Sequence, residues 1–125
     1  GVLENVIRQL SFELLPKCYL EGFSDLQKMV KNNHWPKSPK FIFTSNSFYF
    51  NEAFKLWTAL KTEEDNSKYF VGQHGNCYGQ CLFDGRSGWP ERSTPDGFVT
   101  WGWDDGYKHT IRFSADTSSL TGNDE

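Results

Sequence analysis

From Pro39 to Gly79 the chain reads PKFIFTSNSFYFNEAFKLWTALKTEEDNSKYFVGQHGNCYG. This order of apolar and polar residues predicts a strand at the short aromatic run Phe41–Thr44 and a second strand at Tyr69–Gln73. Between them, apolar residues recur at helical spacing, which places an amphipathic helix over about Asn51–Lys61. Thr62–Ser67 is then expected to be a charged turn. The whole segment therefore predicts a βαβ unit with two adjacent parallel strands.

Periodic apolar residues predict further elements on both sides of this unit. An amphipathic helix over Val2–Leu14 is expected to stop at Pro16, and a second helix should run from Leu20 to about Asn32. A third strand is predicted at Phe98–Gly102, and a short fourth strand at Ile111–Phe113. The fold class that follows is α/β, with a small, mostly parallel, Rossmann-like sheet flanked by helices.

The length of 125 residues indicates one domain or a piece of a larger one. We expect residues 1–113 to form the α/β domain and residues 114–125, which are poor in apolar side chains, to be a disordered polar tail. The glycine-rich segment between Gly75 and Gly97 is predicted to be a long loop. Long loops within compact domains are usually functional or mobile.

Composition narrows the class of protein. A net charge of −3 and a pI near 5.6 argue against a general nucleic-acid binder, which usually carries a basic face. No stretch approaches the ~20 apolar residues that a membrane-spanning helix needs. The three cysteines, Cys18, Cys77 and Cys81, show no disulfide-scaffold pattern, which favours the reducing cytosol.

Two polar segments, Thr44–Ser47 and Gln73–Asn76, follow the two predicted strands of the βαβ unit. Ligands of open α/β sheets bind beyond the carboxyl ends of the strands, so both segments fall at a plausible site. His74 is the candidate catalytic residue, because a histidine can act as a general base on a hydroxyl acceptor. The alternative is a histidine that only completes a tight turn. The candidate substrate-binding residues are Ser45, Asn46, Ser47, Gln73, Gly75 and Asn76.

The polar residues after the first strand have two compatible interpretations. Ser45, Asn46 and Ser47 could donate hydrogen bonds to a sugar or phosphate near the following helix N-terminus. The same residue types also cap helices and form turns.

A metal site is not expected. His74, Cys77 and Cys81 form an H-x2-C-x3-C pattern, but structural zinc needs four ligands, and only Asp84 or the distant His109 could be the fourth. Two unrelated thiols are the favoured interpretation. A small zinc-binding domain is the weakest of the alternatives.

Charged residues near the C-terminus also have two interpretations. Asp104 and Asp105 could bind a metal, but adjacent acids after a strand are more often a solvated turn. Lys108, His109 and Arg112 could meet a phosphate, and a solvated sheet edge is the favoured alternative.

Several motifs carry a resemblance to a known family. The segments FIFTSNSFYFNEAFKLW, YFVGQHGNCYG and FVTWGW, together with LPKCYLEGF upstream, are similar to the LIC12162-type transferases of bacterial O-antigen and surface-polysaccharide gene clusters. The resemblance spans roughly Leu14 to His109, and TSNSF and GQHG-x-x-YG are its most specific pieces. It implies relatives with two Rossmann-like lobes, of the GT-B type. In these relatives a histidine followed by glycine, here His74 and Gly75, is a base or substrate contact.

The resemblance implies that this chain is a fragment of a glycosyl- or related transferase of surface-polysaccharide biosynthesis, inactive alone. Its partners would be a nucleotide-activated donor and a glycan acceptor, with no cofactor, in the cytoplasm or at the inner face of the membrane. The competing class is a non-enzymatic module that binds a glycan or a protein. A lone lobe should also expose aromatic side chains and self-associate, and the expected surface comprises Trp89, Phe98, Trp101 and Trp103.

Overall fold

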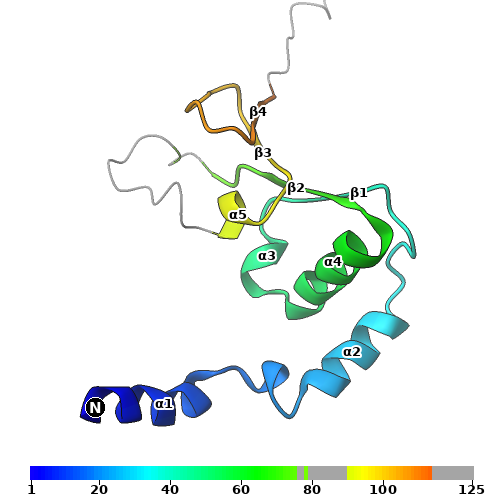
Figure 1. The fold of residues 1–125 in the computed structure, drawn as a ribbon. Coiled ribbons are helices and arrows are strands. Elements are labelled where there is room, and N and C mark those ends of the chain that lie inside the picture. The colour runs from blue at the N-terminus through cyan, green and yellow to red at the C-terminus, as the bar shows by residue number, and fades with distance from the viewer. Residues whose placement is uncertain (76–77, 79–89, 114–125) are drawn as a thin grey trace, which may run out of the picture.

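The computed structural model describes residues 1–75, 78 and 90–113 of the chain. Its centre is a four-stranded, all-parallel sheet in the order β1-β2-β3-β4 (Figure 1). The strands are β1 (Phe41–Thr44), β2 (Lys68–Gly72), β3 (Gly97–Thr100) and β4 (Thr110–Arg112). The predicted Rossmann-like α/β class and the parallel pairing of the first two strands are confirmed.

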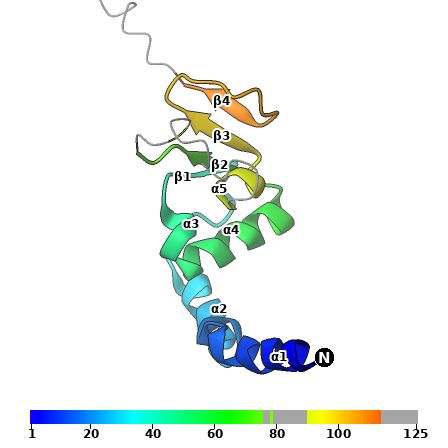
Figure 2. The same ribbon diagram turned by 90° about the vertical axis from the view of Figure 1, so that its left-hand side faces the viewer.

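Helices pack against this sheet and against one another. The helices are α1 (Val2–Leu14), α2 (Phe23–Asn32), α3 (Ser47–Phe50), α4 (Glu52–Asp65) and α5 (Pro90–Ser93), with a 3-10 turn at Lys17–Tyr19. Helix α4 packs against β2, α2 packs against α4, and α5 contacts β3. Helix α1 lies away from the sheet in both views (Figures 1 and 2). Its exposed apolar side chains include Val2, Leu3, Val6, Ile7, Leu10 and Leu14.

Helix α4 is longer than its apolar pattern predicts. The turn expected over Thr62–Ser67 is wrong in its first part, because the helix continues through Asp65. Lys61 and Asp65 form an ion pair of 2.8 Å one turn apart, which supports this last turn. The helix ends at Asn66, whose φ of 54° is the left-handed conformation common after a helix.

The apolar core is formed by residues of α2, α3, α4 and the strands β1 to β3. Its buried members are Leu26, Val30, Ile42, Phe48, Ala53, Trp57, Tyr69, Val71 and Phe98. The expectation that Phe98 is exposed is wrong, because this side chain of the interior strand β3 is only 1% exposed. Trp101 is 60% exposed, Trp103 is half-buried, and Trp89 lies outside the described residues.

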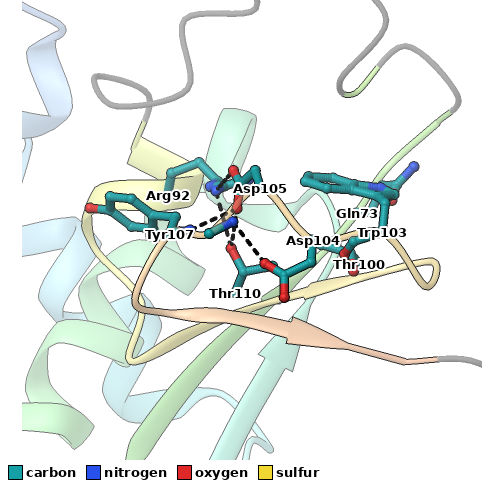
Figure 3. A network of polar contacts seen from close by, with 9 residues as sticks. Gln73, Arg92, Thr100, Trp103, Asp104, Asp105, Tyr107 and Thr110 are labelled. Atoms are coloured by element: carbon teal, nitrogen blue, oxygen red, sulfur yellow. Dashed lines mark hydrogen bonds and ion pairs between the residues drawn. The ribbon is translucent and has the colours of Figure 1, made fainter.

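The connection between β3 and β4 is unusually short. Parallel strands generally need a crossover of about a dozen residues or more, often a helix, whereas residues 101–109 suffice here. A buried ion pair holds this loop: Arg92 Nη2 lies 2.5 Å from Asp105 Oδ2 (Figure 3). Asp105 Oδ1 accepts further hydrogen bonds from Thr110 Oγ1 at 2.8 Å and the Tyr107 N–H at 3.1 Å.

The interpretation of Asp104 and Asp105 as a solvated turn is therefore wrong for Asp105. Its side chain is only 6% exposed, whereas that of Asp104 is 46% exposed. Burial alone would raise the pKa of Asp105. Hydrogen bonds from Thr110 and Tyr107 and the nearby Arg92 outweigh it and lower the pKa below the ordinary value.

Candidate functional site

A cavity of about 790 Å³ opens at the carboxyl ends of β1 and β2. Asn46 and Ser47, which follow β1, line it together with His74, which follows β2 and is exposed. The other lining residues are Leu26, Met29, Tyr49, Phe50, Asn51, Glu52 and Ala53. This volume is typical of small-molecule sites. The structure thus brings the histidine and the polar turn into one cavity at the sheet edge.

Thr44, the last residue of β1, shapes the polar turn. Its side chain is buried, and its Oγ1 accepts hydrogen bonds from the backbone N–H groups of Ser47 at 3.0 Å and Asn46 at 3.3 Å. These bonds turn the chain from β1 into α3. Ser45 is half-buried and is not among the residues that line the cavity. A threonine directly before Ser45 and Asn46 is a usable signal for such a turn.

The cavity walls combine aromatic and polar groups. Phe50 is 93% exposed and Met29 is 58% exposed, so both present apolar surface at the opening. The Asn51 Oδ1 caps α4 through the Phe54 N–H at 2.9 Å. The Glu52 carboxylate accepts from Lys55 Nζ at 2.7 Å and from the Tyr19 hydroxyl. Apolar ring surface beside amide, hydroxyl and imidazole groups suits a ligand with both an apolar face and hydroxyls.

Gln73 does not line the cavity, and its side chain is instead hydrogen-bonded to residues around the His74 turn. Its buried Oε1 accepts a hydrogen bond from Trp103 Nε1 at 2.6 Å; both side chains are drawn in Figure 3. The same oxygen accepts a second hydrogen bond from the Trp101 N–H at 3.1 Å. Its Nε2 donates to the carbonyl of Gly75 at 2.7 Å. Gly75 itself is exposed and has a φ of 97°, which explains glycine at this position. Asn76, also a candidate from the sequence, lies outside the described residues.

Glu91 of α5 has a buried carboxylate that contacts Tyr49, one of the residues that line the cavity. Glu91 is 3% exposed, and its Oε2 accepts hydrogen bonds from Tyr78 at 2.7 Å and Tyr49 at 3.2 Å. Burial, followed by the nearby Glu91 carboxylate, raises the pKa of both tyrosines, so both hydroxyls stay protonated. Glu91 was not predicted to be buried, because it lies in a segment predicted to be loop.

The described residues include no group of three or more histidine, cysteine or acidic side chains arranged to hold a metal. Cys77, Cys81 and Asp84, on which the zinc alternative depended, lie outside the described part. No described helix is long and apolar enough to cross a membrane.

A family model described as LIC12162 family transferase matches residues 2–123. The chain belongs to the LIC12162 family. This confirms the resemblance seen in the TSNSF and GQHG motifs and assigns the chain to a family of transferases. Comparisons with curated proteins and with solved structures gave no match. In this member of the LIC12162 family, the two motifs that carry the resemblance meet at one cavity.

Proposed function

We propose that this chain is one lobe of a longer transferase that moves a glycosyl or related group from a nucleotide-activated donor to a hydroxyl of a glycan acceptor. The proposed setting is the synthesis of bacterial surface polysaccharide, such as O-antigen, in the cytoplasm. The observation that carries the proposal is the single cavity that His74 shares with Asn46 and Ser47 at the carboxyl edge of a Rossmann-like sheet.

In this proposal His74 is the general base. Its ring takes the proton from the acceptor hydroxyl while the hydroxyl oxygen forms a bond to the transferred carbon of the donor. The bond from that carbon to the donor phosphate breaks at the same time, and the nucleoside diphosphate leaves with the bonding electrons. Asn46 and Ser47 hold the acceptor through hydrogen bonds, which keeps the reacting atoms close and aligned.

The diphosphate of the donor needs cationic side chains close to it. The described residues that line this cavity include no lysine or arginine that could neutralise a diphosphate. We therefore assign the acceptor to this cavity and the donor to a second lobe of the longer protein. On this proposal the chain alone is inactive, because catalysis requires both substrates to be held together.

The test is donor turnover by the full-length protein. A panel of UDP-glucose, UDP-N-acetylglucosamine and GDP-mannose is incubated with the protein, and release of the nucleoside diphosphate is measured. Release from one donor, absent with the 125-residue chain alone, is the expected result. Binding of methyl glycosides without release from any donor would instead favour the glycan-binding module.

Phe50 is expected to contact the acceptor. Its ring is 93% exposed at the cavity opening, so it is free to pack against the apolar face of a sugar ring. Phe50→Ala should weaken the binding of methyl glycosides of common hexoses by roughly three- to tenfold, which is the size of one aromatic contact. Ligand-detected NMR titration of the full-length protein measures this change.

Phe41→Ala is the matched control for this variant. Phe41 is also an exposed phenylalanine, at 68%, but it begins β1 and does not line the cavity. Its loss should leave glycoside binding unchanged. Equal losses in both variants, or no loss in Phe50→Ala, would remove Phe50 from the proposed acceptor site.

A further inference from the structure

We propose that a second cavity, at the opposite edge of the sheet from the first, binds an organic ammonium ion that carries an apolar body. This cavity has a volume of about 700 Å³ and is lined by residues of α3, α4 and α5 and of the amino ends of the strands. Asp96 and His109, which directly precede β3 and β4, both line it. The inference does not depend on the proposed function, which concerns the carboxyl ends of the strands.

Much of the wall of the second cavity is apolar. Phe48 of α3 and Tyr69 of β2 line it, and each is only 7% exposed. Pro95 is buried and Phe54 of α4 is half-buried, and both also belong to the lining. Small-molecule sites generally combine such walls with a few polar groups that fix the orientation of the ligand. The walls therefore favour a ligand with an apolar body.

Thr58 of α4 adds a polar group to this wall. The residue is 6% exposed and lines the cavity, and its buried Oγ1 has no hydrogen-bond partner among the described residues. A buried hydroxyl without a partner is unfavourable, because it has lost its hydrogen bonds to water. Threonine side chains in helices populate two χ1 rotamers, so this hydroxyl is free to reorient toward a ligand. A ligand with a polar head group would supply the partner that the fold does not.

The charged side chains of the cavity offer acceptors and no free cation. Lys55, the one lysine among the described lining residues, is paired with Glu52 at 2.7 Å. Asp96 accepts from Lys68 Nζ through Oδ1 and from the Tyr69 N–H through Oδ2, both at 2.9 Å. The Tyr69 N–H and then the Lys68 ammonium lower the pKa of Asp96, so its carboxylate is charged at neutral pH. Each of its oxygens keeps a further lone pair for a ligand.

His109 and Glu63 add two more acceptors. His109 Nδ1 lies 3.2 Å from the Asp96 carbonyl oxygen, which can only accept, so the proton of the neutral ring is on Nδ1 and Nε2 is an acceptor. Glu63 is exposed and contributes a second carboxylate to the lining. An ammonium group donates three hydrogen bonds and carries the opposite charge, so it matches this set of groups. A phosphate or carboxylate ligand would be repelled by the same carboxylates.

The experiment titrates the 125-residue chain with three probes that separate the ring from the charge. Phenethylamine has a ring and an ammonium group, phenylacetate has the ring and a carboxylate, and ethylamine has the ammonium group alone. Amide chemical shifts are followed by NMR at about pH 8, where free imidazole is mostly neutral. Phenethylamine should bind at least about tenfold more tightly than either other probe, with shifts in α4 and at the amino ends of β2 to β4. Equal binding of phenethylamine and phenylacetate, or no saturable binding, would overturn the inference.

Thr58→Val tests the hydroxyl and nearly keeps the shape of the side chain. Binding of phenethylamine should weaken by roughly three- to tenfold, whereas stability should not fall, because no hydrogen bond of the folded chain is lost. Thr62→Val is the matched control. Thr62 lines the same cavity, but its hydroxyl already donates to the Ala59 carbonyl at 3.0 Å, so its loss should leave binding nearly unchanged. Equal losses in the two variants would contradict the role of Thr58.

Glu63→Gln tests the charge. Because this carboxylate is exposed, its loss should weaken phenethylamine binding by only about two- to fivefold. Glu64→Gln is the control, since Glu64 is the next residue of α4, is also exposed and does not line the cavity. It should bind phenethylamine as the unsubstituted chain does. Equal weakening in both variants would reveal general attraction to an acidic protein and would overturn the assignment of the ammonium ion to this cavity.

Discussion

On the proposed function, His74→Ala is expected to lower the turnover of the longer transferase by about 10²–10⁴-fold, the usual effect of losing a general base. This effect is expected because His74 lines the cavity at the carboxyl ends of β1 and β2, where the acceptor is proposed to bind. Its side chain is exposed, so the free energy of unfolding should change by no more than about 0.5 kcal/mol. Nucleotide release and urea unfolding of the same preparations measure the two effects.

The matched control is His34→Ala. His34 is also exposed, but it lies in the connection between α2 and β1 and does not line the cavity. Its removal should leave turnover unchanged. If His74→Ala retains the full rate, then His74 is a turn residue and the base must be sought elsewhere. A large loss of stability in His74→Ala would likewise remove the catalytic explanation.

The largest effect on stability is expected from Asp105→Ala. The Arg92 side chain is 3% exposed, and its guanidinium would be left without its buried carboxylate. Removal of one partner of a buried ion pair generally costs about 3–5 kcal/mol. That is a large share of the ~5–15 kcal/mol that stabilises a typical domain. Urea unfolding gives the value, and Asp105→Asn replaces it if the alanine variant does not fold.

Asp104→Ala provides the comparison at the neighbouring position. Its carboxylate is 46% exposed and lies 3.6 Å from Arg112, a surface ion pair of the kind worth less than about 1 kcal/mol. The double variant Arg92→Met with Asp105→Leu should recover part of the loss, because it leaves no buried charge without a partner. Similar losses in Asp104→Ala and Asp105→Ala would show that the buried pair is not the source of stability.

The same ion pair predicts a dependence on pH. The pKa of Asp105 is lowered in the folded protein below its ordinary value of 3.8. Its contribution to stability is therefore fully present above the unfolded pKa and is lost as the pH falls through the lower, folded pKa. Stability should drop below about pH 4, and this drop should be smaller in Asp105→Asn. If the stability of Asp105→Asn falls with pH in the same way as that of the unsubstituted protein, Asp105 is not the cause of the drop.

The candidate site was only partly predictable from the sequence. The positions of His74, Asn46 and Ser47 follow from the rule that parallel strands bring their carboxyl ends to one edge, and the cavity contains all three. Gln73 was expected to bind substrate, but its amide is taken up by Trp103, Trp101 and Gly75. No local pattern shows which way a glutamine at a strand end will turn.

What the sequence determined by itself was the βαβ frame. The aromatic run of β1, the 3.6-residue spacing of α4 and the run that forms β2 are local patterns, and each reflects burial of one face of an element. These patterns place the strands within one or two residues. They fail at the end of α4, where the Lys61–Asp65 pair extends the helix beyond its last apolar residue.

Only the tertiary structure decided which polar residues are buried. Glu91 and Arg92 are charged and occupy a segment predicted to be loop, yet they are 3% and 4% exposed. Their partners, Tyr49 and Asp105, lie 42 and 13 residues away in the sequence. A charge can be buried only where its partners converge, and that convergence depends on the packing of distant segments. Local periodicity contains no information about this convergence, so the burial of Glu91 and Arg92 follows only from the tertiary structure.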